Sequence, residues 1–116
     1  MDFEEYMIMI NSWDVLDYTT LNVTLFEVTA RKKEELGIEL QRILKYNKIE
    51  KPILEHPHDD LITDYYKVDL TTEHIKKIIN VFRGLETSYL GTKGEATPTA
   101  AFYAGFIDKW NKFLRI

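Results

Sequence analysis

The sequence predicts a small α+β domain, and two kinds of pattern support this. Apolar side chains recur at helical spacing through three long stretches, residues 30–46, 72–90 and 98–114. Two short stretches, residues 21–25 and 66–70, alternate apolar and polar side chains instead, which is typical of strands. We therefore expect a single globular domain of 116 residues with three main helices and a few short strands. An all-helical bundle is the alternative.

The helix at residues 72–90 has the clearest pattern. Its apolar side chains lie three and four residues apart and form one stripe, and Thr71 or Thr72 can cap its first turn. Gly84 lies inside the pattern and weakens it, because glycine is a poor helix former. A glycine-rich segment then ends the helix.

The helix at residues 98–114 carries the broadest apolar face. Thr97 is a suitable cap and Pro98 suits the first helical position. We expect this helix to be central to the core, because one of its faces holds large aromatic side chains, namely Phe102, Phe106, Trp110 and Phe113.

The remaining segments allow more than one interpretation. Thr29 can cap the helix at residues 30–46, but Ile38 points away from its apolar face, so the helix is buried on two sides or Ile38 is exposed. The apolar run at residues 6–10 fits a third strand. It equally fits a helix, because the residues from Asp2 to Glu5 resemble a capping box. Residues 21–28 could likewise extend the helix that follows them.

The composition excludes several classes of protein. The chain has no cysteine, so disulfide bonds, thiolate ligands and thiol catalysis are excluded. Its acidic start and short apolar run do not fit a signal peptide, and no stretch approaches the roughly 20 apolar residues that span a bilayer. We expect a cytoplasmic protein with no membrane partner and no cofactor.

The charges are distributed in blocks along the chain. The first thirty residues hold six acids and no base, and residues 54–74 hold six acids and one lysine. Residues 31–53 hold seven bases and four acids. The net charge of −4 argues against nucleic acid as the main ligand. Within the basic block, Arg31-Lys32-Lys33 is followed at once by two glutamates, so we interpret it as a solvated helix face.

Catalytic and metal-binding motifs are weak. Imidazole and carboxylate groups at His56, His58, Asp59 and Asp60 could bind a divalent ion, but Pro57 holds the backbone extended and no fixed-spacing motif is present. A solvated acidic loop is the favoured interpretation. No Gly-x-Ser-x-Gly elbow occurs, and the glycines around Lys93 lack P-loop spacing. We expect neither a metal site nor enzymatic activity.

The leading functional hypothesis is a protein-binding module that neutralises a basic protein partner, as immunity proteins and antitoxins neutralise nucleases. Carboxylates steer the encounter with a cationic protein, and aromatic side chains anchor the complex. An inhibitor of this kind is small and acidic and needs no catalytic group. The expected contacts combine acids with aromatic anchors: Trp13, Asp14, Asp17, Tyr18, Asp59, Asp60, Asp64 and Tyr65.

Two other functions remain open. One is a non-enzymatic accessory or structural subunit, in a homo-oligomer or in a phage or mobile-element assembly, that associates through apolar surface. The other is a metal-dependent enzyme that uses His56 and His58.

Overall fold

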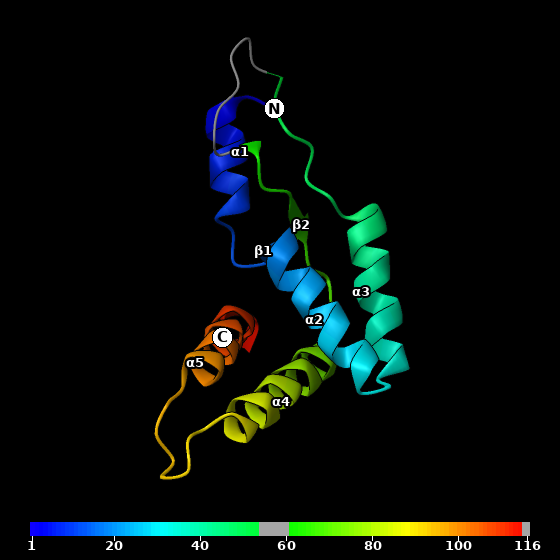
Figure 1. The fold of residues 1–116 in the computed structure, drawn as a ribbon. Coiled ribbons are helices and arrows are strands. Elements are labelled where there is room, and N and C mark those ends of the chain that lie inside the picture. The colour runs from blue at the N-terminus through cyan, green and yellow to red at the C-terminus, as the bar shows by residue number, and fades with distance from the viewer. Residues whose placement is uncertain (54–60, 115–116) are drawn as a thin grey trace.

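The computed structural model describes residues 1–53 and 61–114 of the chain. These residues contain five α-helices and two strands (Figure 1). Because the two strands form an antiparallel sheet, the predicted α+β class is confirmed rather than the all-helical alternative. The elements in chain order are α1 (Phe3–Ile10), β1 (Val15–Asp17), α2 (Tyr18–Ala30), α3 (Glu34–Tyr46), β2 (Tyr65–Lys67), α4 (Thr72–Ser88), α5 (Pro98–Asn111) and the 3₁₀ turn η2 (Lys112–Leu114).

Strand β2 is held on both of its edges. On one edge it pairs with β1, with Leu16 opposite Tyr66. On the other edge, the amide of Ile49 donates to the carbonyl of Tyr65 (2.8 Å), and the amide of Lys67 donates to the carbonyl of Asn47 (3.0 Å). This short sheet therefore joins the start of α2, the end of α3 and the segment that leads into α4.

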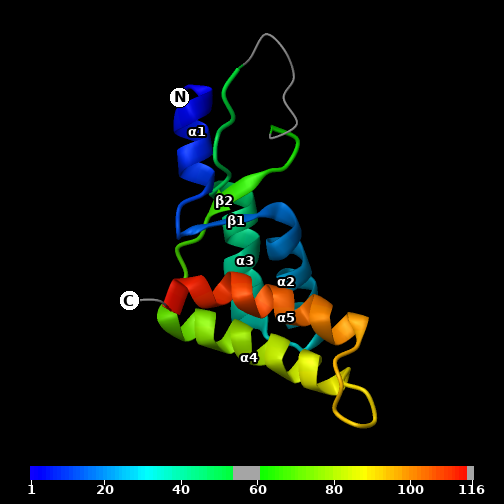
Figure 2. The same ribbon diagram turned by 90° about the vertical axis from the view of Figure 1, so that its left-hand side faces the viewer.

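The buried side chains form two separate cores. The main core lies among α2, α3, α4 and α5, and it includes Phe82 and Trp110, both with 0% exposure. A smaller core holds α1 against the sheet through Tyr6, Ile10, Val15 and Ile49. Helix α1 consequently stands apart from α4 and α5, which lie side by side at the other end of the molecule (Figures 1 and 2).

A buried hydrogen bond joins α5 to α2 inside the main core. The indole Nε1 of Trp110 donates to the hydroxyl of Thr24 at 3.0 Å. That hydroxyl donates in turn to the carbonyl of Thr20 at 2.7 Å. Since all three residues are fully buried, the threonine hydroxyl satisfies polar groups that water cannot reach.

The two C-terminal helices agree with their sequence predictions. The side chain of Thr71 caps α4 by accepting from the amide of His74 at 3.1 Å. The side chain of Thr97 caps α5 by accepting from the amide of Ala100 at 3.1 Å. The last predicted residues of the second helix form η2 rather than α-helix. Gly84 lies inside α4 and does not interrupt it.

The predicted helix at residues 30–46 begins too early. Helix α2 ends at Ala30 and α3 starts only at Glu34, so Thr29 lies within α2 and does not cap α3. The break occurs because Lys32 has a φ of 58°, in the left-handed region that a right-handed helix cannot contain. The basic run from Arg31 to Lys33 is therefore a connection between two helices rather than a helix face.

The strand predicted at residues 21–25 is wrong, because those residues lie in α2. The buried face of this helix includes the polar residues Thr20, Thr24 and Glu27, and Phe26 lies on its exposed side, so the sequence shows no apolar stripe. The strand at residues 66–70 is displaced to Tyr65–Lys67.

The ambiguous residues 6–10 lie in α1, which the carboxylate of Asp2 caps by accepting from the amide of Glu5 at 2.8 Å. Ile38 is 64% exposed, so of the two alternatives for the third predicted helix, exposure of Ile38 is correct and burial on two sides is not.

Over the described ranges, no helix has the length and apolar character needed to cross a membrane.

The Trp110–Thr24 contact leads to a stability prediction. Thr24→Val keeps the shape of the side chain but removes the hydroxyl, so it should lower the free energy of unfolding by about 1–3 kcal/mol. Thr24→Ser keeps the hydroxyl and should cost only about 1 kcal/mol, the value of a lost methyl group. Urea denaturation measures both variants. Equal stabilities for Thr24→Val and the wild type would contradict the role assigned to this hydrogen bond.

Candidate protein-binding surface

The sheet brings most of the predicted contact residues together. Asp17 pairs with Tyr65 across the two strands, and the amide of Tyr18 donates to the carbonyl of Asp64 at 2.9 Å. At the other end of the sheet, the carbonyl of Asp14 accepts from the amide of Val68 at 2.8 Å. Asp59 and Asp60 lie outside the described residues, as do His56 and His58.

Each described carboxylate in this group has a lysine partner within the chain. A basic protein that reached these acids would therefore have to displace a resident ammonium group. The shortest side-chain distances are 3.6 Å from Asp14 to Lys67, 3.3 Å from Asp17 to Lys109, and 2.6 Å and 3.5 Å from Asp64 to Lys51 and Lys48.

Asp17 has a structural role as well as a charge. Its carboxylate caps α2 by accepting from the amide and the hydroxyl of Thr20, at 3.3 Å and 2.6 Å. Burial raises the pKa of Asp17, but the hydrogen bonds from Thr20 and the charge of Lys109 outweigh burial, so the pKa lies below its usual value. Asp17 therefore stabilises the start of α2.

Of the predicted aromatic anchors, Trp13 and Tyr18 are exposed, yet fixed in place, whereas Tyr65 is half-buried against the smaller core. Trp13 is 68% exposed, and its ring contacts Phe113 edge-on with 6.1 Å between centroids. Phe113 in turn packs against the buried Trp110. Tyr18 is 42% exposed and leans on Tyr66. Rings held in this way lose little freedom on binding, which favours their use as anchors.

A groove beside α1 holds apolar side chains that the sequence analysis did not select. Ile8 is 73% exposed and Met9 is 41% exposed, because the opposite face of α1 is already buried in the smaller core. The groove has a volume of about 370 Å³. We call it the α1 groove; its lining residues are Glu5, Ile8, Met9, Ser12, Asp14, Val15, Ile49 and Lys67.

The α1 groove has an acidic rim. Glu4 and Glu5 are exposed residues of the first turn of α1, and neither forms an ion pair with any described residue. Lys67 is the one cation among the lining residues, and it lies 3.6 Å from Asp14. Trp13 lies between Ser12 and Asp14, two residues of the lining. Within the part of the chain that the structure describes, this arrangement places carboxylates without an ion pair next to exposed apolar side chains.

The capping-box pattern at Asp2 to Glu5 was the only sequence signal for this groove. If residues 6–10 are taken as helical, Glu5, Ile8, Met9 and Ser12 fall on one stripe. Taken as a strand, the same residues alternate between faces, which is why the sequence did not select them.

No protein-family model, curated protein or solved structure matches this chain at a significant level. Within residues 1–53 and 61–114, no three His, Cys, Asp or Glu side chains are grouped so that they could hold a metal ion. The functional argument therefore depends on the geometry and charge of the surface.

The lowered pKa of Asp17 leads to a pH-dependent prediction. Asp17→Ala should lower the free energy of unfolding at neutral pH by about 1–2 kcal/mol, as expected for a lost helix cap. Because the pKa is lower in the folded chain, this contribution is complete above about pH 4 and is lost as the pH falls through the lowered value. Urea denaturation from neutral to acidic pH measures it.

Asp17→Asn is the matched control for that prediction. It keeps an oxygen that can accept from Thr20 but has no charge, so its loss of stability should be smaller. If the effect of Asp17→Ala stayed constant as the carboxylate was protonated, the charge of Asp17 would not contribute to stability.

Proposed function

We propose that this chain is a small acidic protein-binding module that neutralises a basic protein partner, as immunity proteins and antitoxins do with nucleases. The observation that carries the proposal is the α1 groove, where Glu5 lies beside the exposed Ile8 and Met9. Glu4 precedes Glu5 in the first turn of α1, and neither acid has an ion pair with a described residue. A cysteine-free chain fits the cytoplasmic location that this proposal includes.

The groove suits a long cationic side chain from the partner. The aliphatic part of an arginine can pack on Ile8 and Met9 while its guanidinium reaches the carboxylate of Glu5. Asp14 becomes available if the partner's cation replaces Lys67. Trp13, held by Phe113, supplies a rigid aromatic contact at the edge. In this proposal the original contact residues at the sheet form the border of the interface, and α1 forms its centre.

Charge reversal on α1 tests the proposal. The tagged chain should capture one basic protein from native lysate at near-equal stoichiometry, and Glu4→Lys should weaken that complex about tenfold or more at low salt. Glu73→Lys is a matched control, because Glu73 is an exposed second residue of α4, as Glu4 is of α1. It should leave affinity nearly unchanged. Isothermal titration with the identified partner measures both.

Two results would reject the proposal. One is capture of no basic protein by the wild-type chain. The other is equal affinity for Glu4→Lys and Glu73→Lys, which would show that α1 is not the interface. The affinity of Ile8→Ser measures the apolar contribution separately from the charge. Ile38→Ser is its control, because Ile38 is also an exposed isoleucine within a helix.

Helix α2 favours the accessory-subunit function as a second candidate. Its only charged residue is Glu27, which is buried at 6% exposure. The exposed side of α2 carries uncharged side chains, including Tyr18, Asn22 and the 69% exposed Phe26. In a chain with 29% charged residues, a solvent-facing helix without exposed charge is suited to contact between copies of the chain.

Sedimentation equilibrium tests this second candidate. If α2 mediates self-association, the chain should form a dimer that persists at high salt, because apolar contacts are not screened. Phe26→Asp should then yield a monomer, whereas Ile38→Asp, at an exposed position of α3, should remain dimeric. A wild-type chain that is monomeric at every concentration would reject the accessory function through α2.

A further inference from the structure

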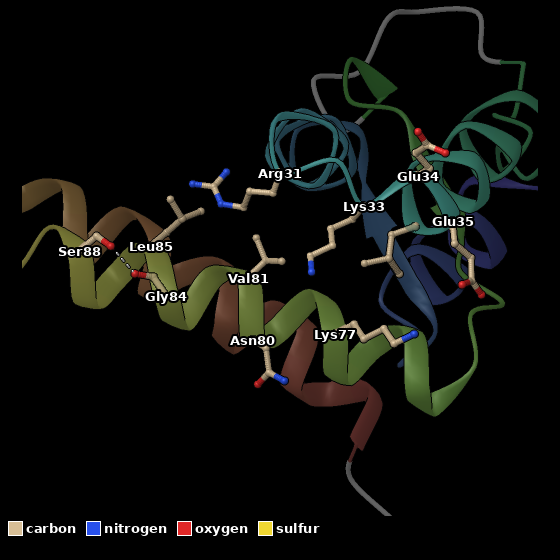
Figure 3. A pocket seen from close by; sticks show the side chains of 11 residues that line it. Arg31, Lys33, Glu34, Glu35, Lys77, Asn80, Val81, Gly84, Leu85 and Ser88 are labelled. Atoms are coloured by element: carbon tan, nitrogen blue, oxygen red, sulfur yellow. Dashed lines mark hydrogen bonds between the residues drawn. The ribbon is translucent and has the colours of Figure 1, made fainter.

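A second groove lies between α4 and the connection from α2 to α3 (Figure 3). Its volume is about 800 Å³, and aliphatic side chains of Leu36, Val81 and Leu85 contribute to its surface. We call it the α4 groove. The remaining lining residues are polar, charged or glycine: Arg31, Lys33, Glu34, Glu35, Lys77, Asn80, Gly84 and Ser88.

Two local features keep the α4 groove open. The left-handed backbone of Lys32 ends α2 and delays the start of α3, so the connecting residues lie beside α4 instead of continuing a helix. Gly84 then leaves space in the middle of α4, because a Cβ built on it would meet no heavy atom within 4 Å.

The cations of the α4 groove are available to a ligand. No described residue pairs with the side chain of Lys33, which points between α3 and α4 in Figure 3. Arg31 uses one guanidinium nitrogen, Nη1, for the carbonyl of Glu27 at 3.0 Å, and the same atom lies 3.7 Å from the Glu27 carboxylate. Its other nitrogens remain for a ligand.

The acids of the groove compensate these cations only in part. The carboxylate of Glu34 points away from α4 in Figure 3. Glu35 is a lining residue that pairs with Nε2 of His74 at 3.0 Å. The hydrogen bond with His74 and, after it, the charge of Lys77 lower the pKa of Glu35, so Lys77 is compensated in part. Between residues 76 and 88, α4 holds one acid, Glu86.

The shape and chemistry of the groove fit a short polypeptide. The lining of α4 extends from Lys77 to Ser88, about 16 Å at 1.5 Å per residue, which matches roughly five residues of an extended chain. Aliphatic side chains of such a segment can pack on Val81 and Leu85, with its carboxylates on Lys33 and Lys77.

Nucleic acid fits the groove less well. Its lining contains no aromatic ring on which a base could stack, whereas its aliphatic surface suits the side chains of a peptide. We propose that the α4 groove binds an acidic peptide segment that carries aliphatic side chains. This site is independent of the α1 groove and takes a ligand of opposite charge.

Selection from a displayed library of random twelve-residue peptides, with the full chain as bait, tests the inference. Enriched peptides should combine acidic and aliphatic residues. A fluorescein-labelled copy of the most enriched peptide should bind the double variant Lys33→Glu/Lys77→Glu about tenfold or more weakly in fluorescence polarisation. The matched double variant Lys32→Glu/Lys76→Glu has the same net charge and reverses neighbours outside the lining, so it should bind within about twofold of wild type.

Gly84 provides a second test that does not depend on charge. Gly84→Leu should fill the groove and abolish peptide binding, while its melting temperature rises above that of the wild type, because leucine is the better helix former. Gly84→Ala gains the same helix propensity with a single methyl group and should retain binding. Loss of binding in a more stable variant cannot be attributed to unfolding.

Four outcomes would overturn the inference: no enriched peptide, enrichment of basic peptides, equal binding by the two double variants, or unchanged binding by Gly84→Leu. Displacement of the peptide by single-stranded oligothymidylate would assign the groove to phosphate chains instead. A dimer of the free chain that Lys33→Glu/Lys77→Glu dissociates would assign it to a second copy. None of these results involves Glu4 or Ile8, so they are distinguishable from a failure of the proposed function.

Discussion

The hydrogen bond from the buried indole of Trp110 to the hydroxyl of Thr24 fixes the end of the chain against its beginning. Around it, Lys109 reaches the carboxylate of Asp17, and Lys112 donates to the carbonyls of Ser12 and Val15. These contacts hold the turn after α1, the first strand and the cap of α2 in one arrangement. The exposed N-terminal surface therefore depends on residues nearly a hundred positions away in the sequence.

An aromatic series extends this constraint to the surface. Trp110 packs on Phe113, and Phe113 contacts the edge of Trp13, so a fully buried ring positions one that is 68% exposed. An exposed tryptophan on a flexible turn would lose conformational freedom on binding, whereas this one is held beforehand.

Within the described residues, the fold pairs some charged side chains with opposite charges and leaves others without an ion pair. The carboxylates at the sheet have lysine partners, and they stabilise the junction of the strands and helices. Within the described residues, Glu4 and Glu5 of α1 and Lys33 of the α4 groove are among the charged side chains without an ion pair. Figures 1 and 2 show α1 and α4 at opposite ends of the molecule, which extends 53 Å along its longest axis. Two ligands of opposite charge could therefore bind without contact.

Local sequence was sufficient where the structural rule is local. The stripe and cap of α4 and the threonine and proline at the start of α5 involve residues only a few positions apart, and each appears in the structure. For α1 the local pattern left strand and helix open, although the Asp2 cap is present. Residues 21–25 of α2 were predicted as a strand, because the buried face of this helix includes Thr20, Thr24 and Glu27 and therefore shows no apolar stripe. The break at Lys32 has no glycine or proline to signal it.

The candidate site depended on long-range contacts. The sequence identified acids near three aromatic residues, of which Trp13 and Tyr18 are exposed and Tyr65 is half-buried. It gave no means of knowing that Lys109 would neutralise Asp17 across 92 positions, or that Ile8 and Met9 would be left outside the smaller core. Helical periodicity and capping are properties of neighbouring residues. The compensation of a charge and the exposure of a side chain depend on which distant segments pack beside it.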